Sequence, residues 1–511
     1  MKSLPNSYSR TRKRLLAAVA SLAVAGAIGV GAITTSTAPV LADAVRVEAP
    51  QVPSFADVVE QVSPAVVSVR VKANVQPTSD DGFGFQDGLP DNPQLREFFK
   101  QFRGFGDNGR NRDGNRRNNQ RNHKSDQPRP VAQGSGFFIS EDGYIVTNNH
   151  VVDAGTAFTV VMHDGTEHDA KLVGTDPRTD LAVLKVDDKE KFTYVAFGDD
   201  SKSRIGDWVV AVGNPFGLGG TVTAGIISAR GRDIGAGPYD DFIQIDASVN
   251  RGSSGGPTFN LNGEVIGINT AIFSPSGGSV GIAFDIPAST AKSVVQDLMK
   301  NGSVQRGWLG VEIQPVTADI AESLGLKSEK GALVASAQDD SPAKKAGVVP
   351  GDVITQVDGK DVASPKELAR LIANEAPGKA VDLTVWRSGK SETIKMDLGT
   401  LPGADKQASA GDQQDTAPAK PDSLADLGLT VTKSDDGKGL VVTDVDPDSA
   451  ASDRGIQAGD IIIAVNSMEV NATQDVTKAM ADAVKAGRKS VLVQVTRNDN
   501  NRFVALPVAK G

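Results

Sequence analysis

The chain has 511 residues, a formal net charge of −9 and no cysteine. This length allows several domains, each with its own core, and the excess of acidic residues argues against a general nucleic-acid-binding protein. The absence of cysteine excludes disulfides, zinc-cysteine sites and thiol catalysis.

The first 44 residues have the three parts of a secretory signal peptide. A positively charged start precedes a small and apolar stretch from Leu15 to Ile33, and Ala42-Asp43-Ala44 then supplies a small-x-small cleavage site. The stretch is close to the minimum length for spanning a bilayer, so an uncleaved membrane anchor is the alternative. Because alanine and glycine dominate it, we expect cleavage and a signal peptide over residues 1–44.

Residues 76–130 interrupt a pattern that otherwise predicts strands. Before them, Ala65 to Val71 is a valine-rich run typical of a strand. The interrupting segment has six phenylalanines, followed by a tract from Arg103 to Arg129 with eight lysines and arginines against three aspartates. This composition predicts a flexible insert. An RNA-binding arm is the alternative, because arginine-rich segments often bind RNA.

Residues 131–287 contain many short apolar runs separated by glycine and asparagine turns. Clear examples are Gly136 to Ile139, Ala157 to Met162 and Trp208 to Val212. Short strands at such spacing indicate an all-β barrel or sandwich. A helix is expected from about Ala288 to Asn301, with Gly302 as its C-terminal stop.

A glycine-rich turn, Asn250-Arg251-Gly252-Ser253-Ser254-Gly255-Gly256, contains the candidate nucleophile Ser254. Glycines reach backbone conformations that strain other residues, and such a turn can direct several N–H groups at one point. An acyl-transfer serine needs this arrangement because its tetrahedral intermediate carries an oxyanion. We predict that the N–H groups of Gly252, Ser253 and Ser254 bind the oxyanion. An ordinary surface loop is the alternative.

A nucleophilic serine also needs a base, held by a third group. His150 is the best candidate among the four histidines, because it ends an apolar run that predicts a strand entering a turn. His163 and His168 flank an Asp-Gly turn signal and His123 lies in the basic tract, so all three are expected to be solvated.

The candidate orienting acid is Asp180, which directly precedes the apolar run Leu181 to Val186. An acid at the start of a buried strand is well placed to hydrogen-bond an imidazole. The order His150, Asp180, Ser254 is that of the chymotrypsin-like triad. Taken singly, His150 and Asp180 could each be structural residues, but the three contexts support one another.

The C-terminal third contains an internal repeat. Ser341-Pro342-Ala343 through Gly351-Asp352-Val353-Ile354 recurs as Ser449-Ala450-Ala451 through Gly459-Asp460-Ile461-Ile462, at an offset of 108 residues. In the first copy, Ser364-Pro365-Lys366-Glu367 predicts a helix with a capping box. The copies resemble PDZ domains, which bind an extended peptide as an added strand. The resemblance implies a carboxylate-binding loop at Trp308-Leu309-Gly310-Val311, and a weaker candidate at Asp426-Leu427-Gly428-Leu429.

Together, Thr147-Asn148-Asn149-His150-Val151, Thr179-Asp180-Leu181-Ala182-Val183 and the glycine-serine turn resemble the motifs of the HtrA (Deg, or Do-like) serine proteases. The resemblance extends from about Pro53 to the C-terminus. One departure is Ser253, where the family usually has asparagine before the nucleophile; the backbone N–H is retained, so no loss of activity is expected.

This resemblance implies a mainly β chain. A chymotrypsin-like protease domain of two six-stranded barrels is expected over residues 53–300, with the triad in the cleft between the barrels and the flexible insert over 76–130. PDZ domains are expected over residues 303–400 and 423–508, joined by a linker over residues 401–422.

The resemblance also implies an ATP-independent serine endopeptidase that degrades misfolded or unfolded proteins of the cell envelope, in the periplasm and without a cofactor or metal. The PDZ domains would recruit the C-terminal tails of substrates. A homotrimer or a multiple of trimers is expected, with the insert reaching a neighbouring subunit. No nucleic-acid partner is expected, and association with a membrane surface stays open.

Substrate preference is less directly indicated. Ser248 stands six residues before the nucleophile, where trypsin-like enzymes carry an acid, so a basic P1 residue is not expected. Val280 to Phe284 resembles the family loop that lines the primary pocket, which makes Ile282 and Phe284 candidate contacts and implies small aliphatic P1 residues. Two other functions stay open: a chaperone that holds unfolded clients, and a pseudoprotease scaffold that only recruits tails.

Overall fold

A computed structural model of the chain describes residues 54–73, 129–153, 155–215, 219–275, 278–402, 422–434, 437–498 and 500–508. By its residue contacts the chain divides into two units, Met1–Pro53 and Ser54–Gly511. The predicted signal peptide, His123 and nearly all of the predicted 76–130 insert lie outside the described residues. Within the described ranges, no helix combines the length and the apolar character that crossing a membrane requires.

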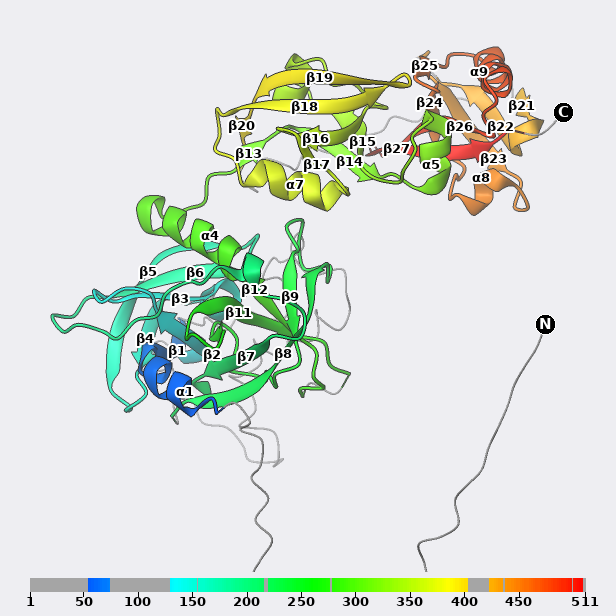
Figure 1. Cartoon of the computed structure of the whole chain (residues 1–511). Helices are drawn as coiled ribbons and strands as arrows, with labels where there is room; N and C mark the ends of the chain where they lie inside the picture. Colours follow the sequence, from blue (N-terminus) through cyan, green and yellow to red (C-terminus); the bar gives the residue numbers. More distant parts are fainter. Residues whose placement is uncertain are drawn as a thin grey trace, which may run out of the picture. The chain divides into compact units, whose positions relative to one another are not determined.

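Six strands close into a first barrel in the order β1-β2-β3-β6-β5-β4 (Figure 1). It is preceded by helix α1 (Ala56–Val62) and the 3-10 turn η1 (Ser63–Ala65). Alternate valines of β1 point into the barrel and are fully buried, as the period of a strand with one core face requires. The strands are β1 (Val66–Ala73), β2 (Arg129–Phe138), β3 (Tyr144–Asn148), β4 (Ala157–Val161), β5 (Glu167–Asp176) and β6 (Leu181–Val186).

A second six-stranded barrel follows, closed in the order β10-β11-β12-β9-β8-β7. The short 3-10 turn η3 (Asp200–Lys202) precedes it. Its strands are β7 (Trp208–Gly213), β8 (Thr221–Arg232), β9 (Phe242–Ile245), β10 (Pro257–Phe259), β11 (Val265–Ile272) and β12 (Ala283–Pro287).

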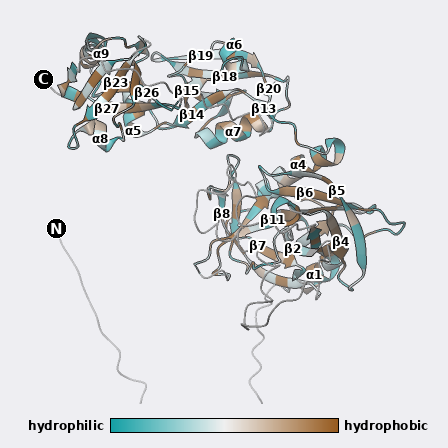
Figure 2. Cartoon of the chain, turned by 180° about the vertical axis from the view of Figure 1, so that it is seen from behind, coloured by the Kyte–Doolittle hydropathy of each residue, from teal (hydrophilic) through white to brown (hydrophobic). Residues whose placement is uncertain are grey.

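One apolar cluster joins the two barrels. It combines residues of β2, β3 and β6 with residues of β7, β10, β11 and β12, and helix α4 (Ala288–Asn301) adds four buried side chains. The helix ends at Gly302, which has the left-handed φ of 71° that glycine adopts without strain. In Figure 2 the hydrophobic colour falls mainly on the strands.

The first predicted PDZ domain is a sheet in the order β14-β15-β16-β18-β19, with β17 paired to β16 and a separate β13–β20 ribbon. The Ser364 hydroxyl caps helix α7 by accepting from the Glu367 N–H, as the sequence predicts. The elements are β13 (Gly307–Trp308), β14 (Val311–Pro315), α5 (Ala318–Leu324), β15 (Ala332–Ala337), α6 (Pro342–Lys345), β16 (Val353–Val357), β17 (Lys360–Asp361), α7 (Pro365–Ala373), β18 (Ala380–Arg387), β19 (Lys390–Asp397) and β20 (Gly399–Thr400).

The second predicted PDZ domain has the sheet order β21-β22-β23-β24-β26-β27, with β25 paired to β24. Its elements are β21 (Asp422–Leu424), η6 (Ala425–Leu427), β22 (Leu429–Lys433), β23 (Leu440–Val445), α8 (Ala450–Asp453), β24 (Ile461–Val465), β25 (Met468–Glu469), α9 (Thr473–Lys485), β26 (Ser490–Arg497) and β27 (Asn500–Pro507). The predicted fold, two six-stranded barrels followed by two small α+β domains, is therefore confirmed.

Candidate active site

His150 and Asp180 are in direct contact. The imidazole Nδ1 lies 2.6 Å from Asp180 Oδ2, and the His150 backbone N–H donates to Asp180 Oδ1 over 2.9 Å. His150 stands on the single helical turn α3 (Asn149–Val152) that follows β3, where the sequence predicts a turn. One carboxylate thus fixes both the backbone and the ring of the histidine.

The backbone of Asp180 is held in an uncommon conformation. Its φ is 56°, in the left-handed region that few residues other than glycine, asparagine and aspartate adopt. The Asp180 carbonyl accepts from the Asn149 N–H at 3.0 Å and from Asn148 Nδ2 at 2.9 Å. These contacts hold the acid at the entry to β6 with its carboxylate turned toward His150.

A buried ion pair anchors the loop that carries Asp180. Arg306, which follows α4, donates to both oxygens of Asp176 over 2.9 and 2.5 Å, and the Thr179 hydroxyl also donates to this carboxylate. Both side chains of the pair are less than one tenth exposed. The Arg306 guanidinium also lies 5.0 Å from the centre of the Tyr239 ring.

Ser254 is 1% exposed and lies in the glycine turn between β9 and β10. Gly255 has a φ of 86°, and a Cβ there would lie 2.3 Å from the Ser135 carbonyl and 2.4 Å from Thr147 Oγ1. Only glycine therefore fits after Ser254 without a shift of backbone. The Ser254 carbonyl accepts from the Ser135 N–H, and the Ser254 hydroxyl is directed at the Thr270 carbonyl over a long 3.4 Å.

Three residues, Asn148, Thr270 and Ser135, connect the surroundings of Asp180 and of Ser254, and the sequence predicted no role for any of them. Asn148 Nδ2, which binds the Asp180 carbonyl, also lies 3.2 Å from Thr270 Oγ1 on the strand that receives the Ser254 hydroxyl. Ser135 donates its hydroxyl to the Gly252 carbonyl and its N–H to the Ser254 carbonyl. Asn148 belongs to the histidine motif and could have been suspected, whereas Thr270 carries no signal of its own.

One of the three predicted oxyanion donors, the Ser253 N–H, already has a partner within the glycine turn. It donates to the Asn250 carbonyl over 3.0 Å, and this bond closes the turn, so the Ser253 N–H is no longer a candidate donor to the oxyanion. Gly252 has a φ of 90°, and a Cβ there would lie 2.7 Å from Pro215. The N–H groups of Gly252 and Ser254 stay as the predicted donors.

The two predicted pocket residues have different surroundings. Phe284 is 7% exposed and packs against Phe242, with ring centres 6.4 Å apart. It is therefore mainly a core residue. Ile282 is half-buried, and its carbonyl accepts from the Phe273 N–H. Ile282 is the better candidate for a contact with substrate.

The predicted carboxylate-binding loop of the first PDZ domain joins β13 to β14. Gly310 has a φ of 76°, and a Cβ there would lie 2.3 Å from Ser341. The carbonyls of Leu309 and Gly310 accept from the N–H groups of Ala343 and Gln338. Half-buried Trp308 and Val311 flank this glycine turn.

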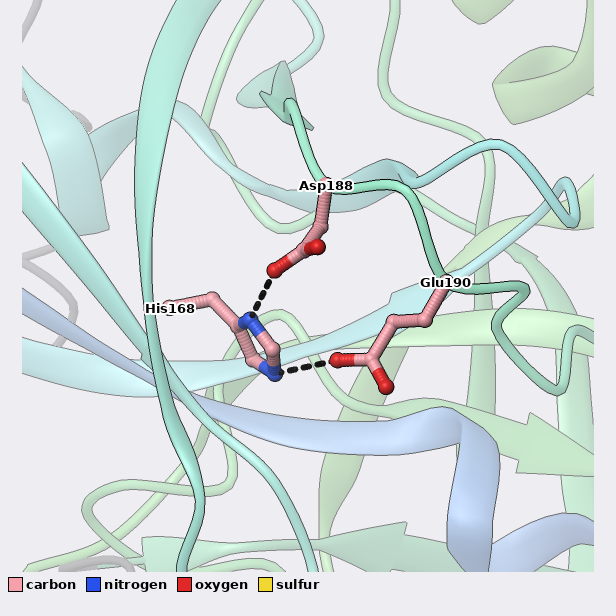
Figure 3. A group of neighbouring side chains, drawn as sticks. All are labelled: His168, Asp188 and Glu190. Atoms are coloured by element: carbon pink, nitrogen blue, oxygen red, sulfur yellow. Dashed lines mark hydrogen bonds and ion pairs between the residues drawn. The ribbon is translucent and has the colours of Figure 1, made fainter.

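The other described histidines lie in different surroundings. His163 is exposed and accepts from the Gly220 N–H. His168 on β5 is less solvated than predicted, with Asp188 Oδ2 3.2 Å from Nδ1 and Glu190 Oε1 3.5 Å from Nε2 (Figure 3). The carboxylates stand at different ring nitrogens, whereas a shared ion would need both at the same nitrogen. These three side chains are the one group of metal-ligand type found among the described residues.

Comparisons with known proteins agree with this arrangement. Residues 134–268 match the model of the trypsin-like peptidase domain, and residues 307–398 and 425–508 each match the PDZ domain. A probable periplasmic serine endoprotease DegP-like of Brucella melitensis is 60% identical over 506 residues, which cover 98% of both chains. The protein of the same name from Halomonas elongata is 40% identical, covering 90% of this chain and 94% of its own.

Solved structures give the same relationship. The HtrA-type protease AlgW with a decapeptide has a TM-score of 0.54 and 39% identity, covering 69% of this chain and all of that one. The same protease with a tripeptide has a TM-score of 0.55 and 36% identity, with 69% and 99% covered. The chain therefore belongs to the DegP-like serine endoproteases of the HtrA type, and it is a serine-type endopeptidase.

Proposed function

We propose that His150, Asp180 and Ser254 form the catalytic triad of this endopeptidase. The observation that carries the proposal is the double contact of the Asp180 carboxylate, with the His150 N–H and with Nδ1. An acid on Nδ1 keeps the proton on that nitrogen and leaves Nε2 as the base.

The proposed reaction has two acyl-transfer steps. The Ser254 hydroxyl leaves the Thr270 carbonyl, a contact weak enough at 3.4 Å to exchange easily, and turns to His150. His150 Nε2 takes the hydroxyl proton while Oγ attacks the peptide carbonyl, and the Gly252 and Ser254 N–H groups bind the oxyanion. The imidazolium then protonates the leaving amine, and a water molecule activated by His150 hydrolyses the acyl-enzyme. No step uses ATP, a metal or a cofactor.

Casein digestion at two temperatures tests this assignment. Ser254→Ala and His150→Ala should abolish digestion, whereas His163→Ala, which changes an exposed histidine, should leave it intact. Equal digestion by Ser254→Ala and the parent protein would refute the proposal. Retained binding of unfolded casein by Ser254→Ala would add client holding to proteolysis. The named relatives are endoproteases, which does not favour a chaperone without proteolysis.

The first PDZ domain is the proposed site for the C-terminal tails of substrates. Strand β14 ends its sheet, so its outer edge pairs with no other described strand. A tail can add to this edge as a strand, with its carboxylate at the loop Trp308-Leu309-Gly310-Val311. Full-length Ser254→Ala should bind a labelled peptide with a free apolar C-terminus and not its C-terminal amide. Equal anisotropy for both peptides would contradict this role.

The proposed substrates are misfolded or unfolded proteins of the cell envelope, and the proposed compartment is the periplasm. The printed names of the relatives support that compartment, and the predicted cleavage after Ala44 is tested by N-terminal sequencing of the mature protein. A homotrimer or a multiple of trimers is proposed from the family resemblance. Light scattering of the purified chain measures it, and a monomeric mass would contradict it.

The proposed P1 preference is for small aliphatic residues, from the resemblance of the segment that contains Ile282. Cleavage-site mapping on casein by mass spectrometry tests it. Cuts mainly after lysine or arginine would contradict it.

A further inference from the structure

The two PDZ domains differ at one strand edge. In each domain a glycine of positive φ, Gly310 or Gly428, lies in the predicted carboxylate-binding loop and directly precedes a strand. In the first domain that strand, β14, ends the sheet. In the second domain the corresponding strand, β22, is covered by one more strand, β21. The edge to which a tail would add is therefore already paired within the second domain.

The register of β21 matches that of a bound peptide. β21 pairs antiparallel with β22, with Asp422 opposite Val431, Ser423 opposite Thr430 and Leu424 opposite Leu429. The strand thus ends beside the start of β22, next to the predicted carboxylate loop. A tail held there by its carboxylate would run in the same direction and leave its last side chain at the position of Leu424.

Two side chains of β21 contact neighbouring elements, Leu424 in the core beside β22 and α9 and Asp422 at the start of α9. Asp422 and Leu424 share one face because strand residues alternate. Leu424 is 6% exposed and belongs to the core cluster that contains Leu429 and residues of α9. The Asp422 carboxylate accepts from the hydroxyl of Thr473, the first residue of α9, over 2.7 Å. Figure 1 draws β21 beside β22 at this edge of the second domain.

We infer that residues 422–424 are an internal pseudo-ligand that closes the peptide groove of the second PDZ domain. The inference rests on the proposed role of the first PDZ domain, which then provides the open tail site of the chain. The second domain accepts a tail only when β21 leaves. A tethered segment acts at an effective concentration of about millimolar, so a tail at about micromolar concentration is disfavoured on the order of 1,000-fold.

A stoichiometry measurement tests this inference on the full-length Ser254→Ala protein. The probe is a labelled peptide with the sequence of residues 417–424, Ala-Pro-Ala-Lys-Pro-Asp-Ser-Leu, ending in a free carboxylate. At micromolar probe the Leu424→Asp variant, which places a charge in the apolar groove, should bind one more probe per chain than its parent. Leu261→Asp is a matched control, because it changes an exposed leucine, and it should leave the stoichiometry unchanged.

The two proposals fail in different ways. If the parent binds no probe but the variant binds one, the tail site in the first domain is refuted and the pseudo-ligand stands. Equal stoichiometry in parent and variant, with α9 amides still protected from exchange in the variant, would overturn the pseudo-ligand.

A measurement on the Ser254→Ala parent needs no change in the second domain. The amides of residues 422–424 should be protected from hydrogen exchange, and millimolar probe should remove that protection while α9 stays protected. Rapid exchange of residues 422–424 without probe would overturn the inference whatever the fold of the Leu424→Asp variant.

Discussion

Replacing Asp285 by asparagine should change how the stability of the second barrel depends on pH. Asp285 lies on β12, is fully buried, and neither of its carboxylate oxygens has a hydrogen-bond partner among the described residues. Its cross-strand neighbours are Asn269 and Ile243. The nearby Thr258 hydroxyl bonds to Asn269, and none of these three neighbours carries a charge.

The magnitude follows from the pKa of this group. Burial raises the pKa of Asp285 from 3.8 to about 7. Between about pH 4 and 7 the folded protein holds a proton that the unfolded chain has released, so the free energy of unfolding falls as pH rises through this window. The difference between 3.8 and about 7 corresponds to about 4 kcal/mol of stabilisation. This contribution to the free energy of unfolding is fully lost above pH 7.

Asparagine stays neutral at every pH, so Asp285→Asn should gain up to about 4 kcal/mol over its parent at pH 8 and almost nothing at pH 4. The assay is hydrogen exchange of β11 and β12 amides in the Ser254→Ala background, comparing both proteins at each pH. Asp169→Asn, an exposed carboxylate of β5, is the matched control. Equal loss of protection from pH 5 to 8 in Asp285→Asn and parent would refute this reasoning.

Three further changes test the site. Asp180→Asn should lower kcat on a peptide substrate on the order of 10⁴-fold while the melting temperature stays within a few degrees, because an amide favours the wrong imidazole tautomer; an unchanged kcat would exclude the role of the acid. Arg306→Ala should lower the free energy of unfolding in urea by about 3–5 kcal/mol, because it leaves Asp176 buried without its charged partner. The joint change Arg306→Met with Asp176→Leu should recover most of this loss, and no recovery would argue against the ion pair as the cause. Gly255→Ala should lower the melting temperature much more than Gly219→Ala. Both glycines have positive φ, but of these two positions only residue 255 would bring the new Cβ against backbone. Equal effects would show that the turn tolerates a side chain.

Local sequence signals predicted the parts of this molecule that depend on neighbouring residues. The alternation of valines in β1, the Gly302 stop of α4 and the Ser364 cap each follow from the types of residue within a few positions. The choice of His150 over the other histidines also followed from local context, and the structure joins it to Asp180.

Features that depend on long-range register were not predictable in this way. The bridge from Asn148 to Thr270 joins residues 122 positions apart. The Ser253 N–H was assigned to the oxyanion from its place in the turn, but the turn closes on Asn250 instead. Asp422 is the last residue of the predicted linker, and only the pairing with β22 shows that it opens a strand whose Leu424 belongs to the core.

Covalent labelling of the folded protein tests the triad most directly. A fluorophosphonate reacts with a serine whose hydroxyl is activated by a base, and the modified residue is located by peptide mass mapping. The parent protein should carry one label, on Ser254, and His150→Ala should carry none under the same conditions. Labelling of another residue, or labelling of Ser254 that persists in His150→Ala at the same rate, would contradict the central claim.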